Sequence, residues 1–112
     1  MYDDTIVAIA TPPGQGGLGV VRLSGPESWA IAARLFDGAL EDRRVAHGYV
    51  RDPDTGAVVD EAMATAMAAP KTYTREDVVE LSCHGSPLVL QRVLALALRF
   101  GARMANPGEF TL

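Results

Sequence analysis

The sequence is poor in several features that mark specialised classes of protein. Its 112 residues include a single cysteine, Cys83, so no disulfide can form within the chain, and a reducing compartment is expected. The longest apolar run, residues 93–98, is too short to span a bilayer. The first residues lack the basic and apolar stretches of a signal peptide. These absences predict a cytoplasmic protein without membrane association.

Positive charge is also scarce and scattered. Ten basic against 14 acidic residues give a net charge of −4, and only Arg43 and Arg44 are adjacent. Because phosphate contacts require clustered basic side chains, direct nucleic-acid binding by this chain is disfavoured. What remains is the ordinary composition of a globular domain, 48% hydrophobic and 21% charged. The length suits one packed core, so we treat residues 1–112 as a single domain.

The apolar pattern predicts short strands and two main helices. The expected strands cover residues 5–11, 20–23, 45–51, 77–82 and 102–105. Ser24 and Glu27 have the spacing of a capping box, which predicts a helix from there to about Phe36. Pro26 is tolerated in its first turn, and Trp29, Ala32, Ala33 and Phe36 are expected to share one face. A second helix is expected from Pro87 to about Phe100, ended by Gly101.

Residues 60–69 are ambiguous because their Ala and Met content favours a helix. A turn at residues 52–56 just before them, and Pro70 just after, favour a strand that continues a hairpin, and we prefer the strand. Strands and helices are thus mixed without a regular βαβ repeat. The sequence therefore predicts an α+β fold with a mixed sheet and two main helices.

Residues 14–19 match the letters of a dinucleotide-binding motif, G-x-G-x-x-G. That motif requires a helix to begin at the loop, so that its amide groups can hold a pyrophosphate. Residues 20–23 predict a strand instead, and no Lys-Ser or Lys-Thr follows Gly19 as a P-loop would require. We favour a tight connection between strands, and a nucleotide-binding enzyme remains the alternative.

Cys83 and His84 are adjacent, which raises the question of a nucleophile and its base. Neighbours on a strand point to opposite faces, so a packed cysteine and a hydrogen-bonded histidine are the preferred interpretation. One cysteine and two histidines also cannot supply a well-spaced four-ligand zinc site, and we expect no metal site.

Two isolated charges in apolar strands are better candidates for a binding site. Glu80 lies between Val79 and Leu81, and Arg22 lies within residues 20–23. Each could simply face solvent on a half-exposed sheet. Alternatively, both line one pocket, where the carboxylate could accept two parallel N–H bonds from an amidine-like ring edge.

Five ordered segments resemble the start of the tRNA-modification GTPase family called MnmE or TrmE. They are DTIVAIATPPG at 4–14, GGLGVVRLSG at 16–25, YTREDVVE at 73–80, CHG at 83–85 and GARMANPGEF at 101–110. Residues 37–69 are the least similar to the family. The resemblance implies an N-terminal domain that binds a tetrahydrofolate, for which 5-formyl-tetrahydrofolate is a stand-in, and forms a homodimer. It also implies a fold similar to the folate-binding domain of aminomethyltransferases.

In this family Arg22 and Glu80 fall on folate-contacting positions, with Glu80 holding the amino-pyrimidine edge and Arg22 near the polar part of the ligand. Arg75 and Ser86 stand where the family commonly has glycine. The resemblance further implies a helical domain and a GTPase domain beyond this chain, with GTP, Mg²⁺ and K⁺. The full-length family protein works with MnmG and FAD on the wobble uridine of tRNA, in a carboxymethylaminomethyl-type modification.

We expect the chain to be a fragment that ends before a lysine of the folate site and before the C-terminal cysteine motif. No catalytic residue is expected within it. The leading hypothesis is a folate-binding dimerisation domain. A dimerisation scaffold without folate binding is the alternative.

Overall fold

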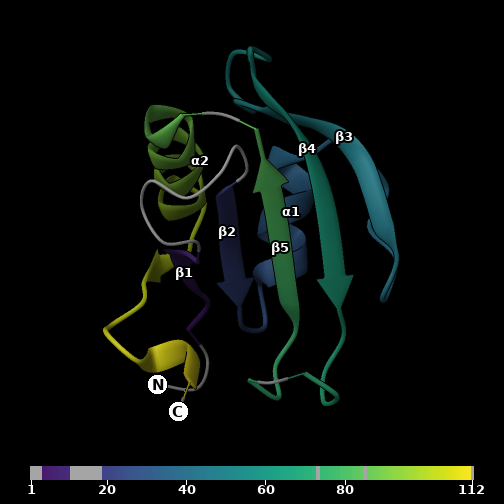
Figure 1. Ribbon diagram of the computed structural model, residues 1–112, viewed down its shortest axis with the longest axis vertical. Helices are drawn as coiled ribbons and strands as arrows, with labels where there is room; N and C mark the ends of the chain where they lie inside the picture. The colour runs from purple at the N-terminus through teal and green to yellow at the C-terminus, as the bar shows by residue number, and fades with distance from the viewer. Residues whose placement is uncertain (1–3, 11–18, 73, 85, 112) are drawn as a thin grey trace.

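Six strands form one mixed sheet in the part of the chain that the computed structural model describes, residues 4–10, 19–72, 74–84 and 86–111 (Figure 1). In chain order the elements are β1 (Ile6–Ile9), β2 (Gly19–Ser24), α1 (Ser28–Leu35), β3 (Val45–Arg51), β4 (Val58–Met67), β5 (Val78–Cys83), α2 (Pro87–Arg99), β6 (Arg103–Met104) and the short 3-10 helix η1 (Glu109–Thr111). The strand order is β3-β4-β5-β2-β1-β6. Only the β1–β6 pair among these is parallel. The expected α+β fold is confirmed.

Alternating side chains of the sheet build the core. Val21 and Leu23 of β2 and Val79 and Leu81 of β5 are fully buried, and they belong to one apolar cluster with residues of both helices. Successive side chains on a strand point to opposite faces. The residues between these four therefore point away from the helices, toward the other face of the sheet.

The ambiguous segment 60–69 is mostly strand, as preferred, because it forms most of β4. Gly56 has φ +75° in the turn between β3 and β4, a backbone conformation that glycine adopts without strain. Within β4, Ala62, Ala64 and Ala66 are completely buried, whereas Met63 is 40% exposed. This alternation favours a strand over a helix, because successive residues of a strand with one buried face point alternately into the core and away from it.

The capping box predicted at Ser24 is wrong. Helix α1 begins later, at Ser28, and Glu27 is its N-cap residue without a side-chain capping bond. Ser24 ends β2 instead, and its hydroxyl group contacts the hydroxyl of Thr74 at 2.8 Å. Thr5 supplies a polar contact at the helix start, since its hydroxyl accepts a hydrogen bond from the Glu27 amide at 2.8 Å.

The predicted face of α1 is also partly wrong, because Ala33 is exposed. The helical residues that are buried are Ser28, Ile31, Ala32 and Leu35. Helix α2 matches its prediction closely: Pro87 occupies its first turn, and Gly101, with φ +120°, follows its end. Neither helix, nor any other in the described ranges, is long and apolar enough to cross a membrane.

Candidate functional site

The structure brings the two predicted binding residues into direct contact. Arg22 and Glu80 are register partners on the neighbouring antiparallel strands β2 and β5. The Nε of Arg22 donates to Oε2 of Glu80 at 2.6 Å. Their side chains are only 27% and 26% exposed, so the pair is largely withdrawn from water and yet still reachable. A charge-assisted bond in this partly dry setting is stronger than one at the open surface.

Small residues flank this ion pair along the sheet. The same row of the register places Ala8 of β1 beside Arg22 and Thr65 of β4 beside Glu80. By strand alternation all four side chains project from the face opposite the helices. Met63 of β4 projects from the same face, two residues from Thr65 along the strand. The pair therefore lies in the middle of the sheet between short side chains, a setting in which a ligand could approach both charges.

Sequence reasoning missed Phe110 as a neighbour of this pair. Its ring lies 5.7 Å from the guanidinium carbon of Arg22, a cation–π contact. The ring comes from η1, and its side chain is half-buried. A phenylalanine that follows a turn gave no indication of which element it would pack against. Only the position of η1 beside the sheet reveals the contact.

The structure argues against a dinucleotide-binding site at the glycine-rich segment. Residues 14–18 lie outside the described residues, but Gly19 begins β2. A nucleotide-binding loop of this type would instead lead directly into a helix. The nucleotide-binding alternative at residues 14–19 therefore fails.

Cys83 and His84 have the structural roles that were preferred for them. Cys83 is completely buried, and burial, with a smaller contribution from Asp60, raises the pKa of its thiol to about 12. Such a thiol is not a nucleophile at neutral pH. The His84 ring lies at the strand end, where its Nδ1 is 3.1 Å from the Glu61 carbonyl oxygen. Across the described ranges, no group of three or more His, Cys, Asp or Glu side chains could hold a metal ion.

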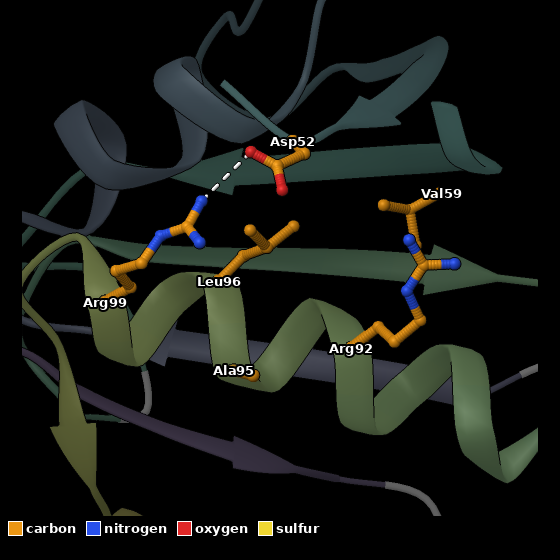
Figure 2. A pocket seen from close by; sticks show the side chains of 6 residues that line it. All are labelled: Asp52, Val59, Arg92, Ala95, Leu96 and Arg99. Atoms are coloured by element: carbon orange, nitrogen blue, oxygen red, sulfur yellow. Dashed lines mark hydrogen bonds and ion pairs between the residues drawn. The ribbon is translucent and has the colours of Figure 1, made fainter. Parts of the chain in front are cut away.

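A separate cavity of about 270 Å³ lies against helix α2, away from the ion pair (Figure 2). Figure 2 shows Leu96 pointing into it from the helix, with Val59 opposite. Arg99 closes one end, since it pairs with Asp52 at 2.9 Å and with Asp54 at 3.0 Å. This ion-pair group ties α2 to the turn between β3 and β4, so the simplest role of the cavity wall is to hold that hairpin.

The two departures from the family pattern differ in their backbone. Arg75 has φ +63°, in the left-handed region that favours glycine. Ser86 has φ −65°, which any residue adopts. At Arg75 an arginine thus occupies a backbone conformation that suits the family's usual glycine. Ser86 is unstrained.

Comparison with known proteins gives the family directly. A family model described as "GTP-binding protein TrmE N-terminus" matches residues 5–112. The tRNA modification GTPase MnmE of Chloroflexus aurantiacus is 59% identical, over 98% of this chain and 25% of that relative. The proteins of the same name from Syntrophobacter fumaroxidans and Geobacter sulfurreducens are 57% and 54% identical, over 96% and 99% of this chain.

The chain spans about a quarter of the length of these relatives, and the match runs over nearly all of the chain. The resemblance found from five short sequence segments is thus confirmed over the domain as a whole, including the middle that looked least similar. This chain belongs to the family of TrmE N-terminal domains.

Proposed function

We propose that this chain is the tetrahydrofolate-binding and homodimer-forming N-terminal domain of a GTPase that modifies the wobble uridine of tRNA. In this proposal the GTPase activity, with its GTP, Mg²⁺ and K⁺, belongs to other parts of that protein, and MnmG and tRNA are partners of the full-length protein. The proposal for the whole protein rests on relatives named tRNA modification GTPase MnmE. A cytoplasmic location follows from that role in tRNA modification.

The Arg22–Glu80 pair is the observation that best supports the folate part of the proposal. A pterin ring presents an amino group and a ring N–H side by side, and a carboxylate can accept both. Glu80 is suited to this because its neighbour Arg22 already holds it at 2.6 Å. Arg22 would then turn its remaining N–H groups toward the polar part of the ligand. A ligand that engages Glu80 must share or replace this ion pair.

Titration calorimetry with 5-formyl-tetrahydrofolate tests the proposal. We expect saturable binding to the purified protein, and a loss of it in Glu80→Ala. Charge-assisted hydrogen bonds contribute about 1.5–3 kcal/mol each, which corresponds to a roughly 10- to 150-fold weaker affinity per bond. Glu61→Ala is the matched control, since Glu61 lies on β4 and pairs with His47 at 2.5 Å. Absence of binding at millimolar ligand, in a folded sample, would refute the folate assignment.

Exposed apolar side chains favour a second candidate function, a dimerisation scaffold without folate binding. Val45 and Tyr49 of the edge strand β3 are 63% and 39% exposed. An edge strand with apolar side chains is a surface on which another chain can pair. Sedimentation separates the candidates: a dimer that does not bind 5-formyl-tetrahydrofolate favours the scaffold, whereas folate binding favours the first.

A further inference from the structure

The C-terminal 3-10 helix η1 reaches the ion pair from a distant part of the sequence. Phe110 places its ring 5.7 Å from the guanidinium carbon of Arg22, whose Nε is bound to Glu80. Arg22 therefore contacts both the carboxylate from β5 and the aromatic ring from η1. In Figure 1 this short helix, drawn in yellow, lies below β1.

A group of polar contacts fixes η1 in this position. Arg103 of β6 donates to both carboxylate oxygens of Glu109, from Nη1 at 2.9 Å and from Nη2 at 2.5 Å. Its Nε donates to Asp4 at 2.8 Å. The amide of Asn106 adds a fourth contact, to Oε1 of Glu109 at 2.8 Å. A bidentate arginine–carboxylate pair restrains both partners in distance and in angle. We call Arg103, Glu109, Asp4 and Asn106 the η1 clamp.

We propose that Phe110 is an aromatic wall of the ligand site and that the η1 clamp positions it there. The proposal rests on the proposed function for the identity of the ligand, a flat heteroaromatic ring whose N–H edge binds Glu80. Such a ring needs contact on its face as well as on its edge. The exposed sheet face supplies mainly short or flexible side chains near the pair, such as Ala8, Thr65 and Met63. Phe110 supplies a rigid aromatic surface beside Arg22.

Phe100 is a control residue, because its contacts with arginines lie outside the proposed ligand site. Phe100 also lies against arginines, with the guanidinium carbon of Arg34 4.3 Å and that of Arg99 5.1 Å from its ring centre. It follows helix α2 and packs against the core cluster. Both phenylalanines are half-buried, and they differ in whether the arginine contacted belongs to the Arg22–Glu80 pair.

Calorimetry on Phe110→Leu and Phe100→Leu tests the wall. Leucine keeps an apolar side chain but removes the π face, and an aromatic contact contributes an amount that corresponds to roughly three- to tenfold in affinity. We expect 5-formyl-tetrahydrofolate to bind Phe110→Leu three- to tenfold more weakly, and Phe100→Leu as well as the unmodified protein. Equal affinity of all three proteins would overturn the wall while leaving the folate assignment intact. No binding to the unmodified protein would overturn both.

Carbon-13 NMR of phenylalanine rings gives a readout that does not depend on a variant folding well. The Phe110 signal is assigned by its loss in Phe110→Leu, or by sequential assignment of the unmodified protein. On addition of 5-formyl-tetrahydrofolate we expect the Phe110 ring signals to shift through the ring current of the pterin, and those of Phe100 to stay in place. Saturation of the protein with no shift at Phe110 would contradict the proposal.

The clamp is tested separately by Glu109→Gln, which keeps the shape of the side chain and removes its charge. We expect weaker folate binding and a displaced Phe110 ring signal even without ligand, because the bidentate pair with Arg103 is lost. Asp54→Asn is the control, since it also removes a carboxylate charge that pairs with an arginine, 3.0 Å from Arg99, but on the helix side. An unchanged affinity and ring signal in Glu109→Gln would show that the clamp does not position Phe110.

Discussion

The energetic coupling between Arg22 and Glu80 is the most direct consequence of the structure that can be measured without any ligand. A double-mutant cycle would combine Arg22→Met, Glu80→Gln and the double variant, with the free energy of unfolding determined by urea denaturation. The pair is 2.6 Å long, and its side chains are 27% and 26% exposed. Exposed ion pairs contribute about 0.2–1 kcal/mol, whereas breaking a buried pair costs about 3–5 kcal/mol.

A pair that is about three-quarters buried should lie between these limits, and we expect a coupling of about 1–2 kcal/mol. Contacting residues in general couple by about 0.5–3 kcal/mol, so the value is measurable above the usual error of about 0.3–0.5 kcal/mol. The pair of Arg51 and Asp37 is the control: it is similar in length, 2.9 Å, but its side chains are 43% and 39% exposed. We expect a smaller coupling there, with a stronger salt dependence. Additive effects of Arg22→Met and Glu80→Gln would refute the pairing on which the site is built.

Three further predictions concern the rest of the domain. The pair with Arg103 lowers the pKa of Glu109 to about 2. The stability that this pair contributes is therefore complete above the ordinary glutamate pKa and is lost as pH falls toward 2. An NMR titration in which Glu109 titrates near 4.3 would contradict this. Cys83, with its raised pKa of about 12, should resist alkylation at pH 8 in the native state and react only after denaturation, which mass spectrometry would follow. Gly25→Ala should lower Tm more than Gly56→Ala, because a Cβ at Gly25 would meet backbone atoms at 2.6 Å whereas nothing lies within 4 Å of one at Gly56; an equal loss would be the contrary result.

The predictions of strand and helix succeeded where a strong local pattern agreed with the burial of one face. Strand β3 was predicted at its observed bounds, Val45–Arg51, and α2 to within a residue at either end. Strand β4 was harder, because alanine favours helices by propensity. Its alternating burial overrode that propensity, which is the usual outcome when tertiary packing and intrinsic preference disagree. For the same reason, the hairpin turn ending in Gly56 predicted this strand correctly, whereas the alanine and methionine content favoured a helix.

The failures concerned contacts between segments that are distant in the sequence. Ser24 and Glu27 have the spacing of a capping box, but the Ser24 hydroxyl group contacts the hydroxyl of Thr74 instead, on a loop that lies beside it in the fold. The contact of Arg22 with Glu80 depends on β2 and β5 being neighbours, although two strands and a helix separate them along the chain. Sequence reasoning could place both charges on a sheet and ask whether they share a site. It could not establish the register that makes them partners.

A charged pair in the middle of this sheet is difficult to explain by stability alone. Replacing a buried ion pair with well-packed apolar residues is often neutral or stabilising, because removing two charges from water offsets much of their attraction. What the Arg22–Glu80 pair provides is a carboxylate held in a fixed orientation on a partly dry surface, and fixed orientation reduces the entropy lost on binding. The same pairing sets a limit on affinity. A ligand that takes the Glu80 oxygen from Arg22 forfeits their coupling, and about 1.4 kcal/mol of coupling weakens binding tenfold. A ligand that offers its own acceptor group to Arg22 avoids this loss. The measured coupling between Arg22 and Glu80 should therefore predict how strongly the site prefers such ligands over ligands that bind Glu80 alone.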